Sequence, residues 1–268
     1  MDFCFSPLFS GSSGNSLYIS AGGVSVLIDA GGTGAQIETA LNAVEVKSSD
    51  LDAILITHEH SDHIKGAGVF SRRHDIPIYA NHATWKAMKN KIGSVSEKNK
   101  REFNQSFYLK DLLVEPYSIP HDAVDPVCFS LSYNGIKLST VSDLGHYTKK
   151  LLSKLENSNV VLLESNHDIE MLRQGSYPMY LKRRILGTKG HLSNDMAAKA
   201  AYELVTLGVR GIMLSHLSEE NNSESIAYKT VSEYLEKKGI EVNRHIALSV
   251  LKKECDAFMY RIGGNDIG

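Results

Sequence analysis

The chain has few cysteines and no long apolar run, and each of these absences excludes a class of protein. Its three cysteines, Cys4, Cys128 and Cys255, are scattered and lack C-x-x-C spacing. Such a set neither builds a disulfide framework nor resembles a zinc knuckle, and it suits a reducing cytoplasm. The chain does not open on a basic segment followed by a long apolar one, and no later segment approaches the length of a membrane span. We therefore expect a cytoplasmic protein that does not bind a membrane.

Excess charge and linker-like composition are also absent. The formal net charge of the 268 residues is −2, which gives no general electrostatic preference for nucleic acid. A polyanion would have to be bound by local basic patches and by metal. No Pro/Ser-rich linker, repeat or charge block divides the sequence, so residues 1–268 are predicted to form a single domain.

What the chain does contain is a dense group of metal-ligand side chains in residues 57–63. This segment, Thr57-His-Glu-His-Ser-Asp-His63, directly follows the apolar run 51–56. A polar loop with surface histidines is the plainer interpretation. The whole H-x-H-x-D-H pattern is far more specific than a lone histidine pair, and it favours a metal site.

The spacing within this segment indicates its geometry. Residues i and i+2 share a face in extended chain and diverge on a helix, so His58 and His60 converge only on a strand or loop. Asp62 then stands at the N-cap of a helix over 62–73, and His63 is expected to point away from the first pair. One short loop can therefore supply ligands to two metal ions.

Apolar periodicity and turn signals predict alternating strands and helices. Residues 10–16 are too rich in Gly and Ser for regular structure and form either a flexible loop or a backbone nest, and the polar stretch 93–101 is expected to be mobile. Two β-rich portions with helices outside them predict an α/β sandwich. The predicted strands are 17–20, 24–28, 52–57, 76–79, 103–108, 112–119, 127–133, 136–141, 160–163, 211–214 and 245–248, and the predicted helices are 33–43, 62–73, 82–92, 195–207 and 224–237.

Four further polar residues each follow an apolar strand, as residues 57–63 do. They are His121, Asp143, Glu164 and His216. The carboxyl ends of strands in α/β sheets form the rim where ligands collect, so these residues can share one cleft. Taken one at a time, each is as well explained as a cap or turn residue.

Two metal ions need about seven or eight protein ligands, and these positions complete the set. Imidazole and carboxylate ligation suits zinc or manganese, so the expected cofactors are two divalent metal ions. We assign His58, His60 and His121 to one ion, Asp62, His63 and His216 to the other, and Asp143 to both.

This ordered pattern resembles the metallo-β-lactamase superfamily, which implies an αββα sandwich with a dinuclear site at one edge. Other stretches resemble the WalJ (YycJ) family, which implies 5′ to 3′ exonuclease activity on double-stranded DNA. Spacing alone indicates only a dinuclear hydrolase. The stretches are 9–16, Pro120-His-Asp-Ala-Val-Asp-Pro126, Ser142-Asp-Leu-Gly145, Glu164-Ser-Asn-His-Asp168, Gly190-His-Leu-Ser-Asn194 and 215–222.

The order of Asp143, Glu164, His191 and His216 also resembles the tRNA 3′-processing endonucleases of the superfamily. That resemblance implies that His191, with Glu164 behind it, contacts the scissile phosphate or protonates the leaving oxygen. Alternatively, His191 only caps the helix over 195–207. The catalytic candidates are therefore His191, Glu164 and Asp62.

Two absences narrow the reaction. The third ligand of lactamases and of glyoxalase II usually lies in a G-H-T or H-T-P-G-H context, whereas His121 lies between Pro120 and Asp122. The β-CASP nucleases insert a whole domain between the bridging Asp and the last His. Only 73 positions separate Asp143 from His216, enough for a helical excursion over about 166–192.

That excursion carries a basic run, Lys182, Arg183 and Arg184, with Lys189 nearby. Such a run is often a solvated helix face, but here it can contact phosphates without reading sequence. The expected partner is nucleic acid, most simply DNA. The alternatives are RNA or a small substrate such as a cyclic nucleotide, and a regulatory member without catalysis. The last is weakened because no ligand position is lost.

Overall fold

The computed structural model describes residues 3–11, 14–251 and 258–263, so Cys255 lies outside the described part of the chain. The strands of this part form two seven-stranded sheets. The first sheet has the order β14-β1-β2-β3-β4-β5-β6. Its strands are β1 (Phe3–Phe9), β2 (Ser16–Ala21), β3 (Val24–Ile28), β4 (Ala53–Leu55), β5 (Ile78–Ala80), β6 (Lys100–Glu102) and β14 (Tyr260–Ile262).

The second sheet combines parallel and antiparallel strand pairs in the same arrangement as the first. Its order is β13-β12-β11-β10-β9-β8-β7, with parallel pairs from β13 to β10 and antiparallel pairs from β10 to β7. Its strands are β7 (Phe107–Leu109), β8 (Leu112–Ser118), β9 (Val127–Tyr133), β10 (Ile136–Val141), β11 (Val160–Glu164), β12 (Gly211–Ser215) and β13 (Ala247–Val250).

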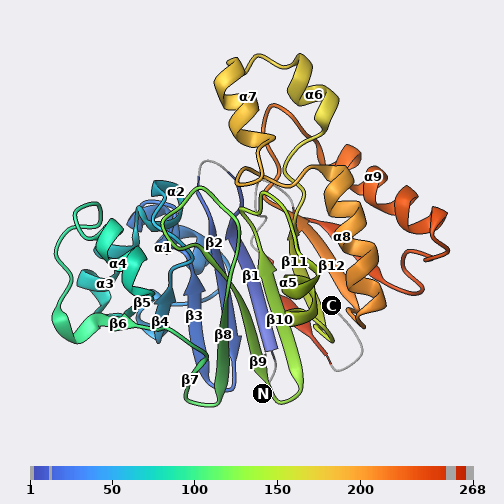
Figure 1. Ribbon diagram of the computed structural model, residues 1–268. Coiled ribbons are helices and arrows are strands. Elements are labelled where there is room, and N and C mark those ends of the chain that lie inside the picture. The colour runs from blue at the N-terminus through green and yellow to red at the C-terminus, as the bar shows by residue number, and fades with distance from the viewer. Residues whose placement is uncertain (1–2, 12–13, 252–257, 264–268) are drawn as a thin grey trace.

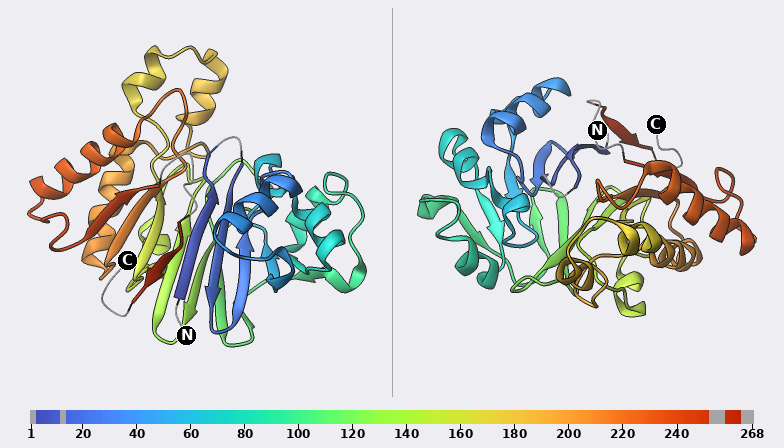
Figure 2. Two further views of the ribbon diagram at one scale, coloured as in Figure 1. Left: turned by 180° about the vertical axis from the view of Figure 1, so that it is seen from behind. Right: turned by 90° about the horizontal axis from the view of Figure 1, so that it is seen from above.

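The helices cover the two outer faces of the pair of sheets. Helices of the N-terminal half lie on one side and those of the C-terminal half on the other (Figure 2). The helices are α1 (Gly34–Ala43), α2 (Ser61–Ile64), α3 (Ala67–His74), α4 (His82–Met88), α5 (Lys149–Lys154), α6 (Ile169–Gln174), α7 (Met179–Ile185), α8 (Asn194–Thr206) and α9 (Glu224–Lys237), with 3-10 turns at Ser48–Asp50 and Glu97–Asn99.

Alternating side chains on the central strands explain this layering. On β3, Val26 belongs to the core between the sheets, whereas its neighbour Leu27 packs under the helices of the first sheet. On β11, Leu162 faces the other sheet and Leu163 faces α8. Because successive strand residues point to opposite faces, strands covered on both faces read as continuous apolar runs. The αββα sandwich implied by the sequence is confirmed.

Local signals account for several element boundaries. Gly22 and Gly23 have φ of 61° and 73°, as the two-residue turn between β2 and β3 requires. Helix α1 begins at a capping box, in which Thr33 accepts from the backbone of Gln36 and the Gln36 side chain accepts from that of Thr33.

The structure differs from the predicted elements in several places. Helix α5 and strand β14 were not predicted, the strand predicted over 103–108 is found only at Phe107–Leu109, and the helix predicted over 82–92 ends at Met88. Strand β1 was missed, because Pro7 interrupts its pattern at a register shift in the pairing with β2. The helix predicted over 62–73 is split into α2 and α3 around Gly66, where a Cβ would lie 2.5 Å from the carbonyl oxygen of Gly32. The stretch 93–101, expected to be mobile, contains a 3-10 turn and most of β6, which pairs with β5.

Residues 166–192 form the predicted helical excursion, which we call the helical arm. It contains α6 and α7, and Figure 1 shows these helices projecting beyond the end of the sandwich, above the second sheet. Among the described residues, no helix combines the length and apolar character needed to cross a bilayer.

Candidate metal centre

The histidines of residues 57–63 converge where β4 passes into α2. His58 is fully buried, and its Nε2 lies 3.0 Å from Nδ1 of His60. His121 follows β8 and brings its Nε2 to 3.4 Å from the same His60 nitrogen. Because His121 Nδ1 faces the Gly190 carbonyl at 3.2 Å, its Nε2 is the nitrogen available to a ligand. Three imidazole nitrogens therefore meet at one point.

Two details of this segment differ from the sequence analysis. Asp62 was predicted as an N-cap, but the N-cap position is His60, and Asp62 lies in the first turn of α2. His63 was expected to point away from the first pair. Instead its ring centroid lies 4.1 Å from that of His58, because Asp29 accepts a hydrogen bond from His63 Nδ1 at 2.7 Å. His63 Nε2 consequently faces Asp143.

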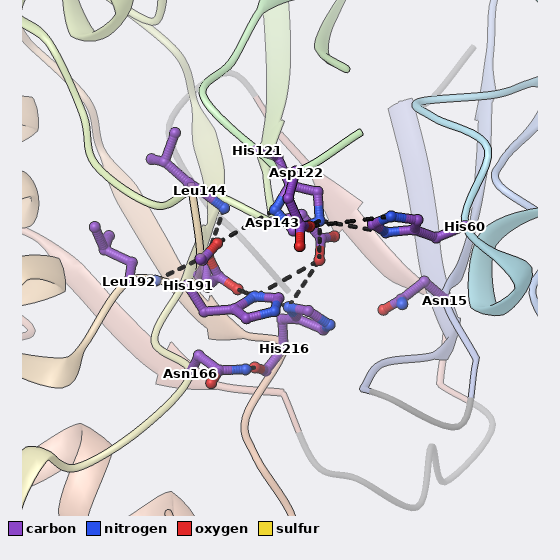
Figure 3. Close-up of polar contacts among 12 residues, drawn as sticks. Asn15, His60, His121, Asp122, Asp143, Leu144, Asn166, His191, Leu192 and His216 are labelled. Carbon is purple, nitrogen blue, oxygen red and sulfur yellow. Dashed lines mark hydrogen bonds and ion pairs between the residues drawn. The ribbon is translucent and has the colours of Figure 1, made fainter. Parts of the chain in front are cut away.

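Asp143 lies between the two groups of histidines (Figure 3). Its Oδ1 is 3.7 Å from Nδ1 of His191 and 3.7 Å from Nδ1 of His216, and its Oδ2 is 3.3 Å from Nε2 of His63. Asp143 Oδ2 is buried and makes no hydrogen bond. A buried carboxylate oxygen without a partner is costly, and a cation between the clusters would supply that partner.

Glu164, the last residue of β11, anchors both histidines on the other side of Asp143. Its Oε1 accepts from Nδ1 of His191 at 2.8 Å and from Nδ1 of His216 at 2.7 Å. Its Oε2 accepts from the backbone N–H groups of Leu144 and Leu192. Although Asp143, Glu164, His191 and His216 form a group compact enough for a metal ion, four donors already occupy the Glu164 carboxylate. Glu164 therefore orients histidines, whose Nε2 atoms are left free.

The electrostatics of the buried groups follow from these contacts. Burial alone would raise the pKa of Glu164, but the charge and hydrogen bond of His191 lower it to about 2. Burial alone would lower the pKa of His216, whereas the charges of Asp143 and Glu164 and the Glu164 hydrogen bond raise it to about 9. Burial and the neighbouring His63 keep the pKa of His58 well below its ordinary value. The neutral imidazole is the form that binds metal, so a cation at His58 would meet a neutral ring, whereas His216 would release its proton on binding one.

Asp29 and Asn15 are site residues that the sequence analysis missed. Asp29 follows β3 and accepts from the backbone N–H and hydroxyl of Thr57 as well as from His63. Asn15 Nδ2 lies 3.1 Å from Nε2 of His63 and 3.4 Å from Oδ2 of Asp62. The signal for Asp29 was available, since it too follows an apolar strand. Asn15 lies in the stretch 9–16 that carries part of the family resemblance, but no role was assigned to it, because this loop was expected to be a flexible loop or a backbone nest.

The backbone at the site adopts a rare conformation at three non-glycine residues. Asp29, Asp143 and His216 have φ of 60°, 57° and 57°. Such left-handed residues cost free energy and persist where the surroundings fix them. His216 is fixed by the Ser10 hydroxyl, which accepts from its N–H, and by Asn166, whose amide donates to its carbonyl.

Five of the seven residues assigned to metal, His60, Asp62, His121, Asp143 and His216, line a cavity of about 500 Å³, and His58 and His63 are buried beside them. The helical arm contributes Tyr177, Leu181, Arg184 and Ile185 to the cavity lining, and Lys91 also lines the cavity. Figure 3 shows His60, His121, His191 and His216 around Asp143.

The four basic residues of the arm have different environments. Lys182 donates to the carbonyls of Arg173 and Gly175, both at 2.7 Å, so it caps α6 and is not available for phosphate. Arg184 lines the cavity and donates to Asp122 at 2.5 Å. Arg183 and Lys189 are exposed, and neither has a hydrogen bond or ion pair within the part of the chain that the structure describes. The four residues, which the sequence analysis treated as one basic run, therefore differ in whether they are available to bind phosphate.

The fold and the histidine–carboxylate centre define a metal-dependent hydrolase of the metallo-β-lactamase class. The profile of the Metallo-beta-lactamase superfamily matches residues 10–144. The chain is 41% identical over 244 residues to "Exodeoxyribonuclease YycJ" of Bacillus anthracis, covering 90% of this chain and 92% of that protein. It is 40% identical over 233 residues to "Exodeoxyribonuclease WalJ" of Streptococcus pneumoniae serotype 2, covering 85% of this chain and 87% of that protein. The chain therefore belongs to the WalJ/YycJ family.

Solved structures support the fold alone. The metallo-beta-lactamase fold protein YhfI of Bacillus subtilis superimposes with a TM-score of 0.73 at 16% identity, over 97% of this chain and all of that one (100%). Unliganded yeast PDE1 gives a TM-score of 0.73 at 12% identity, over 98% of this chain and 99% of that one.

Proposed function

We propose that this chain is an exodeoxyribonuclease that removes nucleotides from double-stranded DNA in the 5′ to 3′ direction, using two divalent cations. The substrate class is supported by the exodeoxyribonuclease names of two relatives that cover most of the chain. Strand preference and polarity come from the family resemblance of the sequence.

The observation that carries the two-cation proposal is the buried Asp143 Oδ2, which makes no hydrogen bond to a described residue and lies 3.3 Å from Nε2 of His63. His58, His60 and His121 would hold one cation, Asp62, His63 and His216 the other, and Asp143 both. The donor set fits this interpretation, because Asp29, Gly190 and Glu164 occupy the Nδ1 atoms of His63, His121 and His216 and leave each Nε2 as the nitrogen that a cation would use. Imidazole and carboxylate donors suit zinc or manganese.

Bound divalent cations supply Lewis-acid stabilisation of an anionic phosphoryl group and lower the pKa of water. The chain's own residues supply the remaining steps. His191 is 19% exposed at its side chain, and Glu164 fixes its Nδ1, so Nε2 is the atom available to the cavity. We assign His191 to hold a proton at Nε2 and deliver it to the leaving oxygen. Asp62, whose side chain is 28% exposed, is the ligand best placed to take a proton from the attacking water.

The basic residues at the cavity would bind the backbone of the substrate. Lys91 and Arg184 line the cavity, and Arg183 and Lys189 are exposed and do not line it. Phosphate contacts of this kind supply affinity without reading sequence. We propose a reducing cytoplasm as the location, since Cys128 is a thiol that takes part in no disulfide within the described part of the chain.

The test uses single- and double-stranded DNA and RNA labelled at the 5′ or the 3′ end, with manganese or zinc added. We expect duplex DNA to lose a 5′ label as mononucleotides at once and a 3′ label only late. The Asp143→Ala protein is the matched control for a contaminating nuclease. Hydrolysis of RNA or of a cyclic nucleotide with duplex DNA intact would replace the proposal by its main alternative.

A further inference from the structure

The cavity above the metal centre is too small for duplex DNA. Its volume of about 500 Å³ lies in the range that holds one small ligand, such as a single nucleotide. The major groove of a DNA duplex is by itself about 12 Å wide. If the proposed function holds, the terminal nucleotide must therefore leave the helical stack to reach Asp143, as in other enzymes that act on an extruded nucleotide.

Removal of the terminal nucleotide exposes the face of the next base pair to water. A flat aromatic side chain at the rim of the cavity would cover that face, and base–aromatic stacking is worth about 1–3 kcal/mol per base. Apolar side chains that enter base steps in this way are a known means of unstacking DNA.

Helix α7 carries a tyrosine next to residues that line the cavity. Its residues Leu181, Arg184 and Ile185 line the cavity, and Tyr180 precedes Arg184 by four positions, so the two side chains are neighbours on the helix surface. Tyr180 is 74% exposed. A tyrosine exposed to this degree has no packing role, which removes the core-packing explanation for it.

The surroundings of Tyr180 favour DNA over a protein partner. Helix α7 carries Lys182, Arg183 and Arg184 in its last turn and no acidic residue in its first. The next residue back from Tyr180, Met179, is 63% exposed and widens the apolar surface. Of these three cations, Arg183 is exposed and unpaired among the described residues, whereas Lys182 caps α6 and Arg184 is paired with Asp122. An apolar surface beside an unpaired cation complements the end of a duplex, which is a flat apolar face bordered by phosphates.

We propose that Tyr180 stacks on the base pair next to the terminal nucleotide and stabilises the unpaired end in the cavity. The inference rests on the proposed function and adds a specificity-determining residue to it. The contribution of Tyr180 should depend on the DNA end, because a terminus that is already unpaired needs no stabilisation by stacking. Tyr180 should therefore matter for blunt duplex ends and little for frayed ones.

The experiment compares initial cleavage rates on a blunt duplex and on the same duplex with three mismatched terminal pairs. We expect Tyr180→Ala to lower the cleavage rate on the blunt duplex about 10-fold or more, which is within the range set by the stacking of one base on one aromatic ring. The same change should lower the cleavage rate on the frayed duplex by less than about 2-fold. Tyr180→Phe should restore the blunt-end rate, because the ring and not the hydroxyl stacks. Tyr108→Ala is the matched control, since Tyr108 is 67% exposed on β7, far from the arm.

The outcomes separate this inference from the proposed function. A wild-type protein that cleaves neither duplex overturns both. Equal losses on the two substrates, or no loss on either, overturn the stacking role and leave the nuclease proposal standing. Failure of Tyr180→Phe to restore the blunt-end rate would also contradict stacking.

Discussion

The two sheets contribute to the site in different ways. The first-sheet group is nearly contiguous: Thr57, His58, His60, Asp62 and His63 come from one loop, with Asp29 behind them. The second-sheet group, His121, Asp143, Glu164, His191 and His216, comes from five separate segments that follow or end different elements. A local sequence motif can hold its own geometry, whereas residues from distant segments need a shared anchor.

Each group has one buried carboxylate as that anchor, and the two anchors differ in what they hold. Asp29 orients a single histidine, His63, together with Thr57 of the same loop. Glu164 orients two histidines, His191 and His216, and two backbone N–H groups. The second-sheet group should therefore depend on its anchor more heavily than the first-sheet group does.

The largest effect is expected at Asp143, where the two groups meet. Asp143→Ala should abolish hydrolysis and lower the metal content, because both cations lose a ligand. Folding should persist, since the change removes a buried oxygen that has no hydrogen bond. Elemental analysis and thermal unfolding measure the two properties. Full activity with unchanged metal content would refute the bridging assignment.

His191 should separate catalysis from metal binding within the second-sheet group. His191→Ala is expected to retain metal and to lower turnover by about 10²–10⁴-fold, the range typical of a missing general acid. Loss of metal would make His191 a ligand. An unchanged rate would leave it without a catalytic role; the alternative that it caps α8 is wrong, because Ser193 is the N-cap of that helix.

The comparison of the two groups can be tested directly by replacing each anchoring carboxylate, Glu164 or Asp29, with the corresponding amide. Glu164→Gln and Asp29→Asn are nearly isosteric, and loss of such partners costs about 10–100-fold in metal affinity or activity. Glu164→Gln should lie at the upper end of this range, because it disturbs two histidines, and Asp29→Asn at the lower end. Titration with zinc or manganese gives both values. A larger loss for Asp29→Asn would show that the contiguous loop, and not the dispersed group, depends on its anchor.

The smallest effect concerns the arm. Arg183→Ala with Lys189→Ala should reduce the steepness of log affinity for duplex DNA against log salt by about 2, because each cation that binds a phosphate adds about 1 to the slope. Lys229→Ala with Lys237→Ala removes the same charge from α9, where both lysines lie near Glu233, and should leave the slope unchanged. Equal slopes for the two double variants would remove these cations from the DNA path.

Much of the site could be predicted because strand ends mark it. The pattern of residues 57–63 and the rule that polar residues collect at the carboxyl ends of strands led to His121, Asp143, Glu164 and His216. The same rule applies to Asp29, which was missed because its partners are distant in sequence.

Other features depend on side-chain direction, which one-dimensional patterns do not contain. Lys182 and Arg183 are adjacent in sequence, yet Lys182 caps α6 and Arg183 faces solvent. His63 turns toward His58 because Asp29 holds its Nδ1. The left-handed backbone of Asp143 and His216 arises from tertiary contacts that no propensity of these residues predicts.

The central claim is that the two groups hold two cations between them, with Asp143 shared and Glu164 outside the coordination sphere. An anomalous difference map from crystals grown with manganese tests it most directly. We predict two peaks per chain, one among His58, His60 and His121 and one among Asp62, His63 and His216, with an Asp143 oxygen bound to each. A single peak, or a peak bound by Glu164, would contradict this account.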